Sequence, residues 1–333
     1  MEHKILVTGG AGFIGSELVS QLAAEGNQVF VVDNLINGKR ENLEEQPTDR
    51  VHLVVADIRD EDQMTSLVEG VDIVFHLACL GVRHSIHSPI ENHEVNATAT
   101  LKLLSIARKA GVKRFVTVSS SEVYGTARCV PMSEEHPTYP MTVYGASKLA
   151  GECYTRAFFR VYNYPTVVVR PFNTYGPRCH HEGDSGEVIP KFMLRCMTDQ
   201  PMVIFGDGSQ TRDFTYVSDT AKGILACGWA EGILGETINL GSGREVSIAS
   251  LARQVAAVVG KPNAEVIHDQ PRPGDVLRLY ADIEKAQALL QYAPQVFFTE
   301  GLQKLKEWYL ERGASLAELL AQEVVRNWEV SEG

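Results

Sequence analysis

The stretch KILVTGGAGFIGSE, residues 4–17, decides the fold of this chain. An apolar run leads into a glycine-rich turn, and the amphipathic segment after the turn predicts a helix from Ser16 to Glu25. The spacing of Gly9, Gly12 and Gly15 is typical of a dinucleotide-binding turn. The first glycine permits the tight turn, the second lets the backbone approach a diphosphate, and the third lets helix and strand pack closely. The order of strand, turn and helix therefore indicates a dinucleotide-binding unit whose helix N-terminus faces the phosphates.

The rest of the first half repeats this alternation of short apolar runs and amphipathic stretches. The apolar runs are QVFVVD (28–33), HLVVAD (52–57), VDIVFHLA (71–78), RFVTVSS (114–120) and PTVVVRPFN (165–173), with helices expected around 60–69, 89–110 and 144–162. The alternation predicts an α/β fold with a Rossmann-like, doubly wound parallel sheet. The runs are almost continuously apolar, as expected for strands that helices cover on both faces.

The rhythm changes after Asn173. A loop-like segment, TYGPRCHHEGDSGEV (174–188), precedes short apolar runs at 202–208 and 237–243 and expected helices at 187–198 and 248–259. We predict three parts: a Rossmann domain over residues 1–173 that carries the cofactor and the catalytic residues, a smaller C-terminal α/β substrate-binding domain over 174–315 with possible returns to the sheet, and a helical tail over 316–333. The acidic, amphipathic tail is expected to be a surface helix without chemistry.

The composition excludes several classes of protein. The 333 residues include 31 Lys and Arg against 42 Asp and Glu, a net charge of −11, which disfavours binding to nucleic acid or to an anionic membrane. The six cysteines form no CxxC pair, so neither a zinc site nor a disulfide framework is indicated. The chain shows no signal peptide and no apolar run of about 20 residues, so we expect a soluble, cytoplasmic protein.

Asp33 points to the identity of the dinucleotide. It ends the second apolar run, where a carboxylate would accept hydrogen bonds from both adenosine ribose hydroxyls and would repel a 2′-phosphate. NAD is therefore favoured over NADP, although Lys39 and Arg40 nearby could serve a 2′-phosphate. Asp57 ends the third run, where it could contact the adenine or cap a helix.

Three residues suggest hydride chemistry on an alcohol. Tyr144 and Lys148 are four residues apart on an expected helix and so share one face. The ammonium group is expected to stabilise the phenolate and lower the pKa of the tyrosine. Such a tyrosine can take a hydroxyl proton while the same carbon gives hydride to a nicotinamide. Ser120, at the end of a strand, could hydrogen-bond the same hydroxyl.

The motifs together resemble the extended short-chain dehydrogenase/reductases, specifically the nucleotide-sugar epimerase/dehydratase family. They are GGAGFIG, DNLINGKREN, ADIRD, FHLA, ENHEVNA, SSSEVYG, YGASK, RPFNTYGPR, GDGSQTRDFTYVSD and RPGDV, and they span residues 8 to about 282. The resemblance implies an enzyme with tightly held NAD that oxidises a nucleotide-diphosphate sugar at C4, with UDP the commonest nucleotide. It also implies a homodimer built on helices near 100–110 and 148–160, and it leaves a non-catalytic NAD-binding sensor as the rival class.

The resemblance also assigns the site. Ser120, Tyr144 and Lys148 are expected to form the catalytic triad. The residues expected to contact the cofactor, together with Tyr144 and Lys148, are Gly9, Gly12, Phe13, Ile14, Gly15, Asp33, Asn34, Asn37, Gly38, Asp57, Ile58, Leu77, Ala78 and Pro171. Those expected to contact the sugar nucleotide are Arg83, Ser121, Asn173, Val188, Lys191, Arg212 and Arg272. Arg212 and Arg272, which lie in the expected substrate-binding domain, suit a diphosphate.

Glu122 bears on which reaction follows oxidation. A 4,6-dehydratase needs a base for the C5 proton, and Glu122 occupies the position of that base in dehydratases and of a glutamate in sugar-acid decarboxylases. Ser121 replaces the aspartate that precedes this glutamate in dTDP-glucose dehydratases, so it cannot be the strong acid. The alternative is that Glu122 faces away from the pocket, because a shift of one residue reverses a strand side chain.

Other features favour different reactions. GVRHS (81–85) resembles a segment of UDP-glucuronate 4-epimerases, and the decarboxylase signature around the catalytic tyrosine is absent. We therefore expect 4,6-dehydration first, 4-epimerisation of a UDP-sugar as the alternative, and decarboxylation of UDP-glucuronate third. His180, His181, Glu182 and Asp184 are adjacent rather than spaced as metal ligands, so no metal is predicted. His84 and His87 could line the pocket or lie on the surface.

Overall fold

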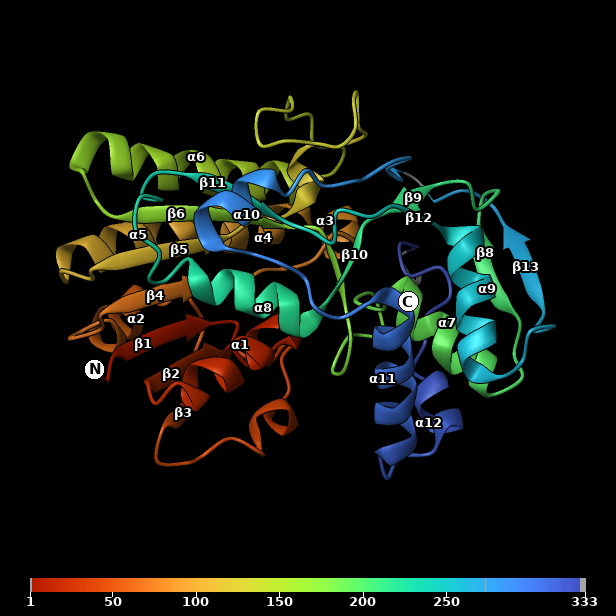
Figure 1. Ribbon diagram of the computed structural model, residues 1–333. Helices are drawn as coiled ribbons and strands as arrows, with labels where there is room; N and C mark the ends of the chain where they lie inside the picture. The colour runs from red at the N-terminus through yellow and green to blue at the C-terminus, as the bar shows by residue number, and fades with distance from the viewer. Residues whose placement is uncertain (1, 273, 330–333) are drawn as a thin grey trace.

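A seven-stranded parallel sheet forms the centre of the molecule. The computed structural model describes residues 2–272 and 274–329 (Figure 1). The strands are ordered β11-β6-β5-β4-β1-β2-β3, and every neighbouring pair is parallel. Their bounds are β1 Lys4–Thr8, β2 Gln28–Asp33, β3 Val51–Val55, β4 Ile73–His76, β5 Arg114–Val118, β6 Thr166–Pro171 and β11 Thr237–Leu240. The predicted doubly wound α/β fold is confirmed.

Helices cover both faces of the sheet. One face packs against α1 (Phe13–Ala24), α8 (Val217–Ala226) and α10 (Glu284–Leu290). The other packs against α2 (Glu61–Leu67), α5 (Ala99–Lys109) and α6 (Val143–Tyr162). Each face has its own apolar core, which explains why the strands read as continuous apolar runs. The carboxyl ends of the strands are left open, and this edge is where ligands bind in such sheets.

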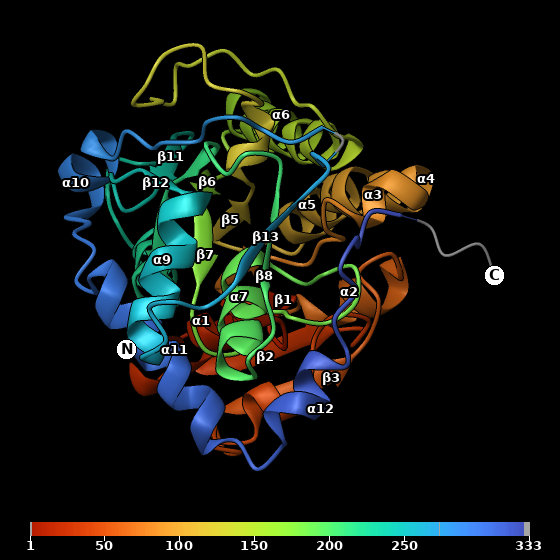
Figure 2. The ribbon, with the colours of Figure 1, turned by 90° about the vertical axis from the view of Figure 1, so that its right-hand side faces the viewer.

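The smaller part gathers around a separate apolar core. It contains three two-stranded pairs: β7 (Asn173–Tyr175) with β10 (Phe214–Tyr216), β9 (Thr211–Arg212) with β12 (Val246–Ser247), and β8 (Met202–Phe205) with β13 (Val266–Asp269). Its helices are α7 (Val188–Met197), α9 (Ile248–Val259), α11 (Phe298–Glu311) and α12 (Leu316–Leu320). Figure 2 looks onto this part, with the sheet behind it. The chain returns from it to the main sheet as β11, while the domain limits at 173 and 315 stay a prediction.

Two predicted helices differ in detail. The helix expected at 89–110 is α4 (Pro89–His93) followed by a π turn, η2 (Glu94–Thr98), and then α5. The predicted helical tail is wrong beyond residue 320, because α12 ends there and the chain continues without regular structure to residue 329. Residues 330–333 of that prediction lie outside the described residues. The remaining short elements are η1 (Arg40–Leu43), α3 (His84–His87) and η3 (Ser121–Val123). None of the described helices is long and apolar enough to cross a membrane.

Candidate active site

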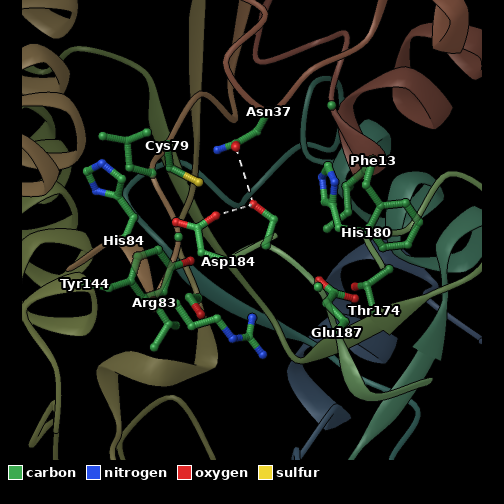
Figure 3. Close-up of a pocket in the computed structure, with 18 of the residues that line it drawn as sticks. Phe13, Asn37, Cys79, Arg83, His84, Tyr144, Thr174, His180, Asp184 and Glu187 are labelled. Carbon is green, nitrogen blue, oxygen red and sulfur yellow. Dashed lines mark hydrogen bonds between the residues drawn. The ribbon is translucent and has the colours of Figure 1, made fainter. Parts of the chain in front are cut away.

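A cavity of about 480 Å³ opens at the carboxyl edge of the sheet, between the sheet and the smaller part. Every residue that the sequence assigned to cofactor, catalysis or substrate lines this cavity. The structure therefore brings together residues from position 9 to position 272, and their individual roles stay predictions. Figure 3 shows Cys79, His84 and Tyr144 on one side and Phe13, Thr174 and His180 on the other.

The glycine-rich turn packs too closely on neighbouring backbone to hold side chains at two of its glycines. Gly9 has φ +70°, and a Cβ there would lie 2.7 Å from the Ala78 amide nitrogen. A Cβ on Gly15 would overlap the Gly9 carbonyl oxygen. Gly12 caps α1 without a side chain, so the first-turn amides of the helix face the cavity without side-chain partners. This arrangement fits the pyrophosphate of a dinucleotide.

The adenosine end fits NAD. Asp33 is buried, accepts hydrogen bonds from the Ala11 amide at 3.0 Å and the Leu35 amide at 2.9 Å, and burial raises its pKa. Lys39, which could have served a 2′-phosphate, pairs instead with Glu182 at 2.5 Å, and Arg40 is exposed. Asp33 therefore keeps its further lone pairs for ribose hydroxyls, while the nearby Lys39 is already paired with Glu182.

Asp57 does not cap a helix. Asp60 is the N-cap of α2, where its side chain accepts from the Gln63 amide. Asp57 instead binds the Arg59 guanidinium at 2.7 Å and the Asn34 side-chain amide at 3.1 Å. Arg59 holds the pKa of Asp57 down, to about 2. Asp57 also lines the cavity, and its predicted contact with the adenine stays a prediction.

The three residues of the predicted triad line the cavity near the end of β5. Tyr144 and Lys148 lie on the first turns of α6, which the Thr142 hydroxyl caps by accepting from the Gly145 amide. Ser120 caps η3 and lies within hydrogen-bonding reach of the Tyr144 phenol. Lys148 is buried and donates to the Val118 carbonyl at 2.7 Å. The three side chains therefore share one wall, with the lysine held by the end of β5.

The expected pKa of the tyrosine is not what the structure gives. Burial raises the pKa of Tyr144 well above its usual value, while the hydrogen bond with Ser120 acts in the opposite direction. The expected net lowering is therefore not seen, and Lys148 donates to the Val118 carbonyl. Burial therefore outweighs the hydrogen bond with Ser120 in setting the pKa of this phenol.

Glu122 faces the cavity. It lies on η3, a 3-10 turn directly after β5, so the strand alternation that could have turned it away does not apply. Its negative charge lies close enough to raise the pKa of Tyr144 and to act on the guanidinium of Arg83. A carboxylate is therefore present beside the predicted catalytic phenol.

Cationic side chains line the substrate side. Arg212 and Arg272 converge on one carboxylate, that of Asp275, at 2.7 and 2.5 Å. Burial lowers the pKa of Arg83 to about 10, and its Nε is buried without a hydrogen-bond partner among the described residues. Asn173 likewise has a buried side-chain oxygen with no partner in the described part of the chain. These unmatched groups around the cavity suit an anionic, hydroxyl-rich ligand.

Sequence reasoning missed several cavity residues. Cys79 and Thr174 line the cavity, and Glu187 does so with a pKa that burial raises to about 7. Asn92 and Asn96 were quoted only within a motif. They are buried on α4 and η2, where Asn92 donates to the Leu80 carbonyl and Asn96 accepts from the Leu80 amide, fixing the loop after β4. The signal in the sequence for these two residues was a pair of polar side chains, four positions apart, on the buried face of a predicted helix.

The histidine-rich loop holds no metal cluster. His180 contacts Glu182 at 3.2 Å, and no group of three or more histidine, cysteine, aspartate or glutamate side chains within residues 2–272 and 274–329 is placed to hold a metal ion. Of the two histidines left open, His84 lines the cavity and His87 lies outside it, paired with Asp184 at 3.2 Å.

A buried ion pair fixes the catalytic helix to the sheet. Glu152, two turns after Tyr144 on α6, is fully buried and receives two hydrogen bonds from Arg170 of β6, at 2.6 and 2.8 Å. Arg170 also donates to the Tyr124 hydroxyl at 2.8 Å, and Tyr124 donates to Asn239 of β11 at 2.7 Å. This network ties α6 to two strands and so sets where Tyr144 and Lys148 lie.

Comparison with known proteins agrees with this geometry. The sequence model of the GDP-mannose 4,6 dehydratase family matches residues 6–305, most of the chain. The chain belongs to this family. It is thus one of the NAD-dependent nucleotide-sugar epimerases and dehydratases, as the motifs indicated, and an enzyme rather than a sensor.

Named relatives carry out different reactions. A UDP-glucose 4-epimerase of Mycolicibacterium smegmatis is 38% identical over 92% of this chain and 98% of its own length. A UDP-N-acetyl-alpha-D-glucosaminuronate decarboxylase of Bacillus cytotoxicus is 33% identical over 93% of this chain and 99% of its own. Among solved structures, DesIV of Streptomyces venezuelae, a dTDP-glucose 4,6-dehydratase with NAD bound, superimposes with a TM-score of 0.86 at 34% identity over 92% of this chain and 97% of its own. The relatives fix NAD and a nucleotide sugar as the ligands but not the reaction.

Proposed function

We propose that this enzyme converts a UDP-sugar to its 4-keto-6-deoxy derivative by 4,6-dehydration. The observation that carries the proposal is Glu122, a carboxylate on the cavity wall beside Tyr144 and Arg83. A plain 4-epimerase needs no base at this position, whereas a dehydratase must remove the proton from C5. UDP is proposed because UDP-sugars are named for both curated relatives.

The protein groups have distinct tasks in this proposal. Bound NAD would accept the hydride from C4 and return it to C6. Tyr144 takes the C4 hydroxyl proton while Ser120 hydrogen-bonds the same oxygen. Glu122 takes the C5 proton, which the C4 ketone has made acidic, and the electron pair forms the C5–C6 double bond as the C6–O bond breaks. With Ser121 too weak an acid, Glu122 delivers the proton that it has just taken to the departing hydroxyl, so that water leaves. As hydride returns to C6, Glu122 passes a proton taken from solvent to C5, and Tyr144 releases the C4 hydroxyl proton to solvent.

The product of a UDP-sugar panel tests this proposal. In deuterated water, dehydration is expected to give a product that has lost one water and carries deuterium at C5, seen by mass spectrometry and NMR. Glu122→Gln should abolish this product yet retain NAD, because the base is lost and the cofactor contacts are not. Glu94→Gln, an exposed glutamate on η2, is the matched control and should keep wild-type activity. Full dehydration by Glu122→Gln would refute the assignment.

Epimerisation is the second candidate, favoured by the Mycolicibacterium smegmatis relative. It would give a product of unchanged mass without deuterium, and Glu122→Gln would then keep substantial activity. Loss of carbon dioxide would instead indicate the reaction named for the Bacillus cytotoxicus relative. A cytoplasmic location and a homodimer belong to the same proposal.

A further inference from the structure

The C-terminal strap, residues 321–329, reaches the active-site cavity. Four of its residues, Glu323, Val325, Asn327 and Trp328, line the cavity wall. The family match ends at residue 305, well before the strap. The two curated relatives align over 98% and 99% of their own lengths but over only 92% and 93% of this chain. Part of this chain therefore has no counterpart in them.

The strap is fixed to the substrate side by specific contacts. On α7, Lys191 donates to the Val324 carbonyl at 2.8 Å and Arg195 pairs with Glu323 at 2.8 Å. Further along, Arg326 makes a two-point contact with Asp269 of β13, at 2.8 and 2.9 Å. The anchors at positions 323, 324 and 326 lie on both sides of Val325 and directly precede Asn327 and Trp328, so the strap is held as part of the wall.

The strap also holds the loop that crosses the cavity. The buried Asn327 side chain donates to the carbonyls of Asp184 and Gly186, at 3.2 and 3.0 Å. In the same loop, Ser185 hydrogen-bonds Asn37 of the cofactor side at 3.3 Å (Figure 3). The strap thus supports a continuous connection from the substrate side of the cavity to the cofactor side.

Trp328 gives this end of the cavity an aromatic wall. It is 7% exposed and meets Phe205 edge-to-face, with the ring centroids 4.6 Å apart and the planes at 85°. Phe205, Gln210 and Arg212 follow one another along the chain and all line the cavity. An aromatic pair suits a flat base, and a guanidinium in the same cavity suits a phosphate, so together these side chains fit the parts of a nucleoside diphosphate.

We propose that the C-terminal strap completes the subsite for the nucleobase of the substrate, with Trp328 and Phe205 as its aromatic wall. The inference rests on the proposed nucleotide-sugar substrate but not on the reaction that follows. Base-to-aromatic contact favours any base through its π face, and edge groups such as Gln210 add selectivity. Trp328 is thus a specificity-determining residue that the family match does not contain.

Binding of nucleoside diphosphates to the NAD-loaded, full-length enzyme tests the proposal. UDP, dTDP, CDP and GDP are titrated by calorimetry, and the tightest is used for the variants. Trp328→Ala should weaken its binding about tenfold or more, while Trp328→Phe should restore most of the affinity. In turnover, the loss should appear in KM with kcat little changed. Gln322→Ala, at an exposed strap residue that does not line the cavity, is the control and should bind as wild type.

Several outcomes would overturn the proposal. Wild-type affinity in Trp328→Ala, or in a chain shortened after Leu320, would show that the strap is not part of the subsite. A fall in affinity accompanied by loss of bound NAD and a lower Tm would show a merely structural role. If no diphosphate binds the wild type, both this inference and the proposed substrate fail. Tight UDP binding with no dehydrated product would overturn only the proposed reaction.

Discussion

Tyr144 and Glu122 illustrate how position determines chemistry for single residues. Glu122 lies on η3, directly after β5, and Tyr144 lies on the first turn of α6. Both side chains line the same cavity. The spacing of four residues between Tyr144 and Lys148 predicted that both would share one face of a helix, and both lie on α6. The sequence could not show that Lys148 would donate to a backbone carbonyl, since that depends on where β5 ends.

Replacing Tyr144 by phenylalanine should remove the proton-transfer group and nothing else. We expect turnover to fall by about 10²–10⁴-fold, the usual contribution of a positioned acid or base. Bound NAD should be retained, because the glycine turn and Asp33 are untouched. Turnover is measured by product formation and NAD by absorbance after denaturation. Near-normal turnover in this variant would remove Tyr144 from the mechanism.

Among the elements, strands and long helices were predictable and irregular turns were not. The helix at 248–259 and the sheet strands agree with their predicted ranges, because their apolar periodicity is strong. The π turn at 94–98 interrupts a helix whose sequence pattern looks continuous. The direction of the Glu122 side chain was uncertain for the same reason. A 3-10 turn of three residues and a strand of three residues have the same pattern in the sequence.

The ion pair between Glu152 and Arg170 should be essential to α6. Glu152→Ala leaves a buried guanidinium without its carboxylate, and we expect the free energy of unfolding to fall by about 3–5 kcal/mol. Urea unfolding measures the loss. The double variant Glu152→Leu with Arg170→Met removes both charges and should recover much of the stability. If the single variant is as stable as wild type, the pair does not hold the helix.

His76 of β4 should make the sheet sensitive to acid. It is buried, contacts the Thr8 and Thr100 hydroxyls at 2.7 and 2.9 Å, and burial lowers its pKa to about 3. The unfolded chain binds a proton near the ordinary pKa of about 6.5, whereas the folded protein does not. Stability is therefore full above about pH 6.5 and falls toward pH 3, by about 1.4 kcal/mol per pH unit from this group. Urea unfolding from about pH 7 to pH 4 should show a shallower dependence for His76→Gln.

At the scale of the whole molecule, long-range contacts limit what a sequence can reveal. The Asn327 side chain donates to the Gly186 carbonyl, which lies 141 positions earlier in the sequence, and no periodicity or motif predicts such a contact. The tail therefore looked like a surface helix, although it lines the cavity. In contrast, most of the parallel sheet order follows from repeated βα units that place each strand beside the previous one, with a single switch where β4 returns to the other side of β1.

The predicted homodimer is also a property of the whole molecule. α5 and α6 pack side by side on one face of the sheet, and α6 ends with Val161 70% exposed and Tyr162 52% exposed. If these helices form the dimer contact, Val161→Glu should yield monomers in sedimentation experiments. Leu310→Glu, at a similarly exposed site on α11, should remain a dimer. A monomeric wild type would refute the expectation outright.

The thiol of Cys79 in the wall of the cavity has a practical consequence. It lines the site together with Tyr144, whereas Cys129 and Cys153 are exposed elsewhere and Cys179, Cys196 and Cys227 are buried. An alkylating reagent such as N-ethylmaleimide should modify Cys79 more slowly once a nucleotide sugar occupies the cavity, while labelling of Cys129 and Cys153 stays constant. Peptide mass spectrometry would then report site occupancy in one sample, with the two exposed thiols as an internal standard.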